Sequence, residues 1–445
     1  METNFEKIGV RIPRILLPSK DIDLQKWAVV ACDQYTSQEK YWKDVEKFVS
    51  NSPSTLNLIF PEVYLEKEGK QERINKIIES MREYLSKGYL QETEPCLVLV
   101  DRKTKNTSSR KGLILSIDLE KYDYNKGSSS IIRATEGTIL ARLPPRIEVR
   151  KDAIIELPHI LVLIDDPQKT VIEPLFQKLG SFEKIYDFDL MMKSGHLKGY
   201  KISDEVQIMK IVQALEKLAD KKIFEQKYNV QDKSVLLFAM GDGNHSLATA
   251  KAVWEEKRKK LSKEEIKDHP ARFALVEIMN VHDPGLEFEP IHRVVFNVPE
   301  DFLERMSQYF ENQGSKFSTR DAEEKNIEKA LLNNKKSIQI IPYIMKGEIG
   351  LITIENPKKN LAVGSLQDFL EDVSKNSGIT IDYIHGEDVV KSLSLKEGNI
   401  GFLLPKMDKK ELFKTVILEG ALPKKTFSMG EASEKRFYLE SRKIA

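Results

Sequence analysis

The sequence has very few cysteines, since only Cys32 and Cys96 occur among its 445 residues. Both lie in short apolar runs that are typical of buried strands. Two buried thiols fit a reducing compartment better than a disulfide-stabilised framework. We therefore expect a cytoplasmic protein without disulfide bonds.

The sequence also lacks an excess of charge of one sign and any long apolar run. Its 70 Lys and Arg residues nearly balance its 69 Asp and Glu residues. A protein that binds the nucleic-acid backbone usually has a basic excess, so we expect no nucleic-acid partner. No stretch approaches the roughly eighteen apolar residues of a membrane-spanning helix, and Met1–Arg14 lacks the apolar core of a secretory signal. We therefore expect no membrane association.

The length and composition predict a chain of two or three domains with sizeable cores. At roughly 150 residues per domain, 445 residues correspond to two or three domains, and 40% hydrophobic residues are enough to fill their interiors. The pattern changes near Pro299, so we predict a main domain over 1–300 and a C-terminal α/β part over 301–445. Strands and helices mix without strict alternation, which indicates an α+β (mixed α/β) fold.

Hydrophobic periodicity predicts helices and strands along the whole chain. Ile74, Ile77, Ile78 and Met81 recur at helical spacing, and Gly88 ends that helix. Buried strands are predicted at Cys96–Val100, Leu113–Ile117, His159–Ile164, Val235–Met240 and Phe273–Val281. The first two of these strands are expected to pair across the polar turn between them.

A glycine-containing turn after one of these strands is the best candidate for a binding site. The strand Val235–Met240 leads into Gly241-Asp-Gly-Asn-His-Ser246, and the residues that follow predict a helix. The first N–H groups of a helix have no partner within it and carry about half a positive charge in sum. Phosphate is the usual anion at such a position. Gly241 and Gly243 let the backbone approach an anion without a Cβ in the way.

The polar side chains of the turn suggest further roles. Asn244 or Ser246 could cap the helix. Asp242 could hold Mg²⁺ or accept a proton, and His245 could donate to an oxyanion. The turn is not a P-loop, because the ending Gly-Lys-Ser/Thr is missing. The alternative interpretation is a capped helix that follows a glycine turn and binds no ligand.

A set of short motifs resembles one known family. These motifs are Ile132-Arg-Ala-Thr-Glu-Gly-Thr138, Arg142-Leu-Pro-Pro-Arg146, Pro158-His159, Leu163-Ile-Asp-Asp-Pro167, Met240–Ser246, His292-Arg293 and Phe427-Ser-Met-Gly-Glu431. They are spread over nearly the whole chain, and together they resemble the uncharacterised bacterial family called domain of unknown function 1015.

The turn is also similar to the Asp-Gly-His-His-Arg type of motif in the ParB/sulfiredoxin-like superfamily, whose members bind nucleotide phosphates there. This resemblance implies a ParB/sulfiredoxin-like nucleotide-binding core, ATP or ADP with Mg²⁺ at Gly241–Ser246, and a small-molecule kinase with L-serine as the leading substrate. Ser246 stands where the superfamily motif ends in an Arg that touches phosphate. Four cations could replace that Arg, namely Arg133, Arg142, Arg146 and Lys251.

A kinase needs a carboxylate that orients or deprotonates the attacking hydroxyl. Glu136 is the first choice for this role, because its position matches a His-Glu-x-Thr motif of other family members. Arg133 and Arg142 would clamp phosphate oxygens, and Thr138 is grouped with them as a nucleotide-binding residue. The alternative for Glu136 is an ordinary turn carboxylate that pairs with Arg133.

Other polar residues are weaker candidates. Asp165-Asp166 follows a strand, where Mg²⁺ ligands are common, but a turn that begins with Asp-Pro is the favoured interpretation. His292-Arg293 would meet an anionic group of the substrate, and Asp33 would line the same site. His159, next to a proline, is expected to be a structural histidine.

Two other functions remain open at this point. One is a nucleotide-binding regulatory module of the ParB type, which would bind CTP or ATP without an acceptor. The other is a metal-assisted hydrolase that uses Asp242, His245 and His292. A zinc site of His282, Asp283 and His292 is not expected, because their spacing matches no metalloprotease motif. The sequence does not indicate an oligomeric state.

Overall fold

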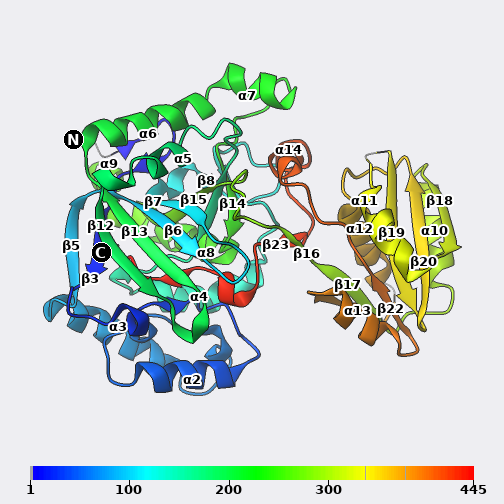
Figure 1. Cartoon of the computed structure of the whole chain (residues 1–445), viewed down its shortest axis with the longest axis horizontal. Helices are drawn as coiled ribbons and strands as arrows, with labels where there is room; N and C mark the ends of the chain where they lie inside the picture. Colours follow the sequence, from blue (N-terminus) through cyan, green and yellow to red (C-terminus); the bar gives the residue numbers. More distant parts are fainter. Residues whose placement is uncertain (1–3, 336, 376) are drawn as a thin grey trace. The chain divides into compact units, whose positions relative to one another are not determined.

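The strands of the chain form two large sheets that belong to two separate units (Figure 1). The computed structural model describes residues 4–335, 337–375 and 377–445. The first unit comprises Met1–Glu287 and Met429–Ala445, and the second comprises Phe288–Ser428. The expected division at residue 300 differs from this one, because the last residues of the chain return to the first unit.

The large sheet of the first unit is mixed. Its strands lie in the order β12 (Glu183–Asp189), β13 (His196–Ile202), β6 (Leu97–Lys103), β7 (Arg110–Asp118), β15 (Phe273–Asn280), β11 (Leu161–Ile164), β14 (Phe238–Asp242), β9 (Ile132–Arg133) and β8 (Tyr122–Asp123). The pairs β11·β15, β14·β9 and β8·β9 are parallel, and the others are antiparallel. The predicted pairing of β6 with β7 is confirmed, and so is a mixed α/β class.

Hydrophobic clusters cover both faces of this sheet. On one face, Leu115 of β7 belongs to a buried cluster with Ile211 of α6 (Glu205–Leu218) and Leu247 of α8 (Asn244–Arg258). On the other face, Ile114 belongs to a cluster with Trp42 of α2 (Glu39–Val49). The predicted helix that contains Ile74 is α3 (Lys70–Ser86), which packs in this second cluster. Burial on both faces explains why these strands are continuous apolar runs in the sequence.

The second unit has an antiparallel sheet of its own. Its strands lie in the order β18 (Lys316–Asp321), β20 (Glu348–Glu355), β19 (Ile338–Met345), β22 (Asn399–Phe402), β17 (His292–Phe296) and β21 (Thr380–Ile384). A buried cluster joins Val295 of β17 and Ile341 of β19 to Phe302 of α10 (Phe302–Asn312) and Phe369 of α12 (Ala362–Ser374).

Shorter elements complete the two units. The helices are α1 (Leu24–Trp27), α4 (Leu143–Arg150), α5 (Glu173–Phe176), α7 (Lys221–Tyr228), α9 (Lys263–Asp268), α11 (Ile327–Leu332), α13 (Glu387–Ser394) and α14 (Lys409–Glu419). The strands are β1 (Asn4–Phe5), β2 (Val10–Arg11), β3 (Arg14–Pro18), β4 (Val29–Val30), β5 (Leu90–Pro95), β10 (Ile155–Glu156), β16 (Glu289–Pro290), β23 (Phe427–Ser428), β24 (Phe437–Tyr438) and β25 (Arg442–Lys443). None of the helices within residues 4–335, 337–375 and 377–445 combines the length and apolar character needed to cross a bilayer.

Buried ion pairs fix the C-terminal segment, Met429–Ala445, in the first unit. Arg436 is 4% exposed and pairs with Glu277 of β15 and with Glu440 of the same segment. Arg102 of β6 donates to the carbonyls of Lys435 and Ser433. β24 also pairs with β4, so both ends of the chain meet in this unit.

We predict that Arg436→Met lowers the free energy of unfolding by about 3–5 kcal/mol, because two buried carboxylates lose their cation. Urea unfolding followed by tryptophan fluorescence measures this loss, since the three tryptophans are buried in the first unit. Arg82→Met is the control, because Arg82 is exposed on α3. A loss below about 1 kcal/mol, as for surface ion pairs, would contradict the anchoring role of Arg436.

Candidate active site at the start of helix α8

Parallel pairing brings two of the sequence motifs to one edge of the large sheet. β14 and β9 are parallel neighbours, so the residues that follow them share an edge. Thr135, just after β9, donates from Oγ1 to the carbonyl of Met240 at 2.7 Å. β11 is antiparallel to β14, with Leu161 opposite Asp242, so the start of β11 lies at the same edge. His159 lies two residues before the first residue of this strand.

The glycine turn itself leaves the start of α8 uncapped. Gly243 is the N-cap residue, with φ of 78°, and it has no side chain that could cap. The expected cap from Asn244 or Ser246 is wrong, because the helix already begins at Asn244 and both residues lie inside it. The N–H groups of Asn244 and Ser246 donate to no partner among the described residues, and neither residue is buried. Asn244 Oδ1 is also unpartnered there.

The two glycines of the turn are required for different reasons. A Cβ at Gly243 would meet the Ile160 Cα at 3.1 Å, and its left-handed backbone is one that other residues rarely adopt. A Cβ at Gly241 would meet the Met429 side chain at 2.9 Å. The backbone of the turn is therefore held close to both β11 and the C-terminal segment.

Asp242 carries the charge of the turn and is paired with a lysine from the end of the chain. Its Oδ2 lies 3.0 Å from Nζ of Lys435, and its Oδ1 accepts the Gly243 N–H at 3.0 Å. Burial acts to raise the pKa of Asp242, but Lys435, His159 and the Gly243 N–H hold it below its ordinary value. Asp242 is therefore ionised at neutral pH and lies beside a buried cation.

His159 is held by hydrogen bonds rather than packed as an apolar residue. Tyr438 Oη accepts the Cys32 N–H at 3.1 Å, so its own hydrogen is available to His159 Nδ1, which lies 2.6 Å away. Burial raises the pKa of Tyr438 well above its ordinary value, which keeps that hydrogen in place. We assign the ring proton to Nε2, which faces Asp33 Oδ2 at 3.7 Å. Asp33 thus lies beside His159 at this edge of the sheet.

Three of the four cations proposed to replace the missing motif Arg have other contacts, and the fourth, Arg142, is exposed. Arg146 forms a two-point ion pair with Glu62. Arg133 donates to the carbonyls of Ser130, Ser234 and Val235. Lys251 pairs with Glu255 one turn further along α8, at 3.1 Å. Arg142 is exposed at the start of α4.

The remaining predicted residues lie around the same edge or inside α8. Glu136 is half-buried in the loop after β9, and Thr138 Oγ1 in that loop is buried without a hydrogen-bond partner among the described residues. His245 is half-buried on the first turn of α8, where its carbonyl accepts the Thr249 hydroxyl at 2.7 Å. The structure therefore places Glu136, Asp242 and His245 on segments that leave neighbouring parallel strands.

Sequence reasoning missed Lys435, Tyr438 and Glu62. Lys435 and Tyr438 come from the C-terminal segment, far along the chain from the turn, and no local motif marks them. The nearest signal was Phe427–Glu431, which belonged to the family resemblance but had no assigned role.

His292 and Arg293 lie in the second unit, where both are buried. His292 Nδ1 accepts the Leu404 N–H at 3.0 Å. Arg293 donates to Gln367 Oε1 at 3.1 Å and to the carbonyls of Ile291, Lys424 and Lys425. These contacts give both residues structural roles in their own sheet.

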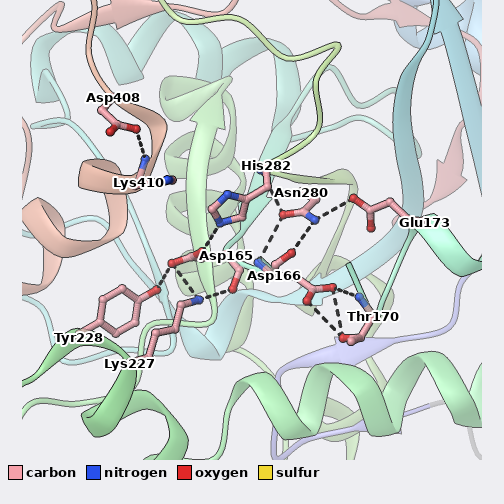
Figure 2. Close-up of polar contacts among 10 residues, drawn as sticks. All are labelled: Asp165, Asp166, Thr170, Glu173, Lys227, Tyr228, Asn280, His282, Asp408 and Lys410. Carbon is pink, nitrogen blue, oxygen red and sulfur yellow. Dashed lines mark hydrogen bonds and ion pairs between the residues drawn. The ribbon is translucent and has the colours of Figure 1, made fainter. Parts of the chain in front are cut away.

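A second polar cluster lies at the opposite edge of the large sheet, where β11 and β15 end (Figure 2). Asp165 Oδ1 lies 2.6 Å from Nε2 of His282, and Lys227 and Tyr228 reach Oδ2. Burial acts to raise the pKa of Asp165, but His282, Lys227 and Tyr228 lower it overall.

The neighbouring Asp166 shapes a loop. Its carboxylate accepts the N–H groups of Thr170 at 2.5 Å and Val171 at 2.9 Å (Figure 2). Asn280 Nδ2 donates to the Asp166 carbonyl and to Glu173, both at 2.8 Å. These contacts fit the turn that was the favoured interpretation of Asp165-Asp166. Among the described residues, no three His, Cys, Asp or Glu side chains gather as a metal site.

An open helix start at the edge of a mixed sheet defines a class of site that suits phosphate groups. The sequence matches the model of the family described as "Protein of unknown function (DUF1015)" over residues 16–374. The chain therefore belongs to this family, as its motifs suggested. No curated protein matches the sequence.

Several solved structures match the chain at low sequence identity and low TM-score. A mutant free serine kinase in complex with ADP is 10% identical, with a TM-score of 0.40, over 77% of this chain and 95% of that chain. A free serine kinase in complex with AMP is 11% identical, with a TM-score of 0.39, over 74% of this chain and 92% of that chain. A conserved hypothetical protein from Pyrococcus furiosus is 12% identical, with a TM-score of 0.37, over 74% of this chain and 95% of that chain. TM-scores below 0.5 do not assign an activity.

We predict that the ring of His292 titrates near pH 4. Burial, with Arg293 and His385 nearby, lowers the pKa of His292 to about 4, whereas an unfolded His titrates near about 6.5. As the pH falls below about 6.5 the unfolded chain takes up the proton first. The free energy of unfolding therefore falls by roughly 3 kcal/mol in all as the pH is lowered from about 6.5 to about 4.

Nuclear magnetic resonance of the labelled histidine rings measures this titration, and the His292→Gln variant identifies the signal by its loss. Far-ultraviolet circular dichroism over the same pH range checks that the protein stays folded during the titration. A midpoint near pH 6.5 would show that His292 is exposed to solvent, against the structure.

Proposed function

We propose that this protein is a nucleotide-dependent phosphotransferase that transfers a phosphoryl group from ATP or ADP to the hydroxyl group of a small molecule, with L-serine as the leading candidate. The single observation that carries the proposal is the uncapped start of α8 beside the pair of Asp242 and Lys435. Backbone N–H groups without protein partners, next to a buried cation, are suited to phosphate oxygens.

Lys435 takes the electrostatic role of the Arg that the superfamily motif has at the position of Ser246. Phosphoryl transfer depends mainly on charge neutralisation and alignment. In this proposal the N–H groups of Asn244 and Ser246 bind phosphate oxygens, and Lys435 balances their charge. Arg142, exposed at the start of α4, is the second cation that this edge of the sheet offers.

The residues present also fit a magnesium ion that arrives with the nucleotide. Mg²⁺ in such sites keeps several waters and binds one or two carboxylates plus phosphate oxygens. Asp242 and Asp33 are carboxylates of this edge, linked through His159. The ion would neutralise phosphate charge, and Asp242 would hold it.

Glu136 is the proposed base for the acceptor hydroxyl. It follows β9, whose end lies beside the end of β14, so it leaves the sheet at the same edge as the phosphate turn. Asp33 is the proposed contact for the ammonium group of serine. His292 and Arg293 are not part of this proposal, because hydrogen bonds inside the second unit already occupy them.

We predict that the protein forms O-phosphoserine from serine with ATP or ADP, and that Glu136→Gln lowers turnover by roughly a hundredfold or more. Nucleotide affinity should stay within a few-fold, because the turn is unchanged. Mass spectrometry measures product and calorimetry measures affinity, with Glu79→Gln, exposed on α3, as the control. Near-normal turnover in Glu136→Gln would remove this residue from the mechanism.

We also predict that Lys435→Met weakens nucleotide binding by at least about tenfold, which corresponds to about 1.4 kcal/mol. Lys87→Met, an exposed lysine that pairs with Glu83, should leave binding unchanged. Circular dichroism checks that the variants fold. Unchanged nucleotide affinity in Lys435→Met would show that the nucleotide does not bind beside Lys435 at the turn.

The same experiments distinguish the alternatives. Tight binding of CTP or ATP without any phosphorylated acceptor would favour the regulatory module. Stoichiometric transition metal in the purified protein would favour the metal-assisted hydrolase.

A further inference from the structure

One hydroxyl group holds two residues in place at the edge of the sheet where α8 begins. Tyr438 Oη accepts the Cys32 N–H at 3.1 Å and lies 2.6 Å from His159 Nδ1. The Cys32 carbonyl accepts the Glu62 N–H at 2.8 Å, so the backbone that leads into Asp33 is held on both sides of Cys32. Asp33 and His159 therefore depend on the same tyrosine for their positions.

The ring of His159 has an N–H group that forms no hydrogen bond with any described residue. Because Tyr438 donates to Nδ1, the ring proton is on Nε2. Asp33 Oδ2, which Nε2 faces, lies 3.7 Å away, and this is too far for a hydrogen bond. The side chain of His159 is only 7% exposed, but Nε2 is not one of the fully covered polar atoms that lack a partner. A ligand can therefore reach this N–H group.

Asp33 has a carboxylate oxygen that is similarly available. Its Oδ1 accepts the side-chain amide of Gln34 at 2.9 Å, whereas its Oδ2 has no hydrogen-bond partner among the described residues. Within the same part of the chain, Asp33 forms no ion pair with a lysine or an arginine. The side chain is 28% exposed, so Oδ2 lies at a half-buried position where a ligand can replace water.

The neighbouring carboxylates already have cations. Glu62 pairs with Arg146 at 2.5 Å, and Asp242 pairs with Lys435 at 3.0 Å. Burial raises the pKa of Glu62, and the negative charge of nearby Asp33 acts in the same direction. The charge of Asp33 therefore remains unbalanced in this neighbourhood. Because a half-buried charge is stabilised by an opposite one, Asp33 favours a ligand with a positive group.

We propose that the acceptor is a vicinal amino alcohol, whose ammonium group binds Asp33 Oδ2 and whose hydroxyl oxygen accepts the Nε2–H of His159. This inference rests on the proposed function, because it names the class of acceptor for that site. Amino and hydroxyl groups on adjacent carbons match a carboxylate oxygen and an N–H group that lie 3.7 Å apart. The hydroxyl can accept from His159 and still donate to Glu136, since it has one hydrogen and two lone pairs.

This inference gives His159 and Tyr438 roles that the sequence did not indicate. His159, expected to be a structural histidine, becomes a contact of the substrate. Tyr438 touches neither group of the acceptor but holds both residues that do, so it is a positioning residue. L-serine belongs to the class of vicinal amino alcohols, and so does ethanolamine. Since the two contacts use only the ammonium and hydroxyl groups, the carboxylate of serine is not required for recognition.

Calorimetric titrations of the full chain with ethanolamine, ethylamine and ethylene glycol, with Mg²⁺ and an ATP analogue that has a β,γ-imido bridge, test the two contacts. Ethanolamine should bind at least about tenfold more tightly than ethylamine, which lacks the hydroxyl, and than ethylene glycol, which lacks the ammonium group. Asp33→Asn should remove the preference over ethylene glycol, whereas Asp44→Asn, exposed on α2, should keep it. Absence of ethanolamine binding, or equal ethanolamine affinity in Asp33→Asn, overturns the proposal.

His159→Gln and His159→Leu test the second contact, because the amide of glutamine can replace the Nε2–H donor and leucine cannot. Ethanolamine affinity should fall less in His159→Gln than in His159→Leu. Tyr438→Phe should also lower it, with nucleotide affinity within a few-fold of the parent protein. Nitrogen magnetic resonance of the histidine rings should show the proton of His159 on Nε2 and a shift of that signal when ethanolamine binds. An unmoved signal, with equal losses in the two His159 variants, would overturn the role of His159 as a contact.

The fate of this inference can be told apart from that of the proposed function. Ethanolamine binding that depends on Asp33, without any phosphorylated product, would contradict the phosphotransferase and support the amino-alcohol site. Formation of O-phosphoserine with an unchanged KM for serine in Asp33→Asn would contradict the amino-alcohol site and support the phosphotransferase.

Discussion

The buried ion pairs of Arg436 with Glu277 and Glu440 are the constraint on which the candidate site depends. A charge in the interior is tolerated only when it is paired and hydrogen-bonded, so these contacts fix the position of the segment rather than merely add to its stability. Lys435 immediately precedes Arg436, and Tyr438 follows two residues later. With Arg436 fixed in this way, Lys435 reaches Asp242 of the turn, and Tyr438 reaches His159 beside it.

The mixed sheet gives its two edges different chemistry. At one edge the ends of β14 and β9 meet the start of β11, which brings Asp242, the Glu136 loop and His159 together. At the other edge β11 and β15 end in parallel, and Asp165 and His282 there engage each other. An all-parallel sheet would have gathered both sets at one edge. The reversal at β14 therefore separates the phosphate turn from the second polar cluster.

Local pattern was enough to predict much of this fold. Helical spacing of Ile74 and Ile77 predicted α3, and the glycine turn predicted the start of α8, because both depend on residues close in sequence. The return of the C-terminal segment was missed, since nothing near Lys435 or Tyr438 indicates a partner so distant in the chain. The cap from Asn244 or Ser246 was wrong because the helix begins one residue after Gly243, whose left-handed backbone lies too close to Ile160 for a Cβ, and sequence does not reveal this packing.

A cation delivered from a distant segment differs physically from one within the motif. An Arg at position 246 would be present as soon as α8 formed, whereas Lys435 reaches Asp242 only after the C-terminal segment has docked. Until then Asp242 would lie beside the helix start without its cation and would repel a phosphate. In the proposed mechanism, nucleotide affinity therefore depends on whether the last residues of the chain have docked in the first unit. Arg436 and Arg102 hold the docked segment in place, and neither is part of the proposed phosphate contacts.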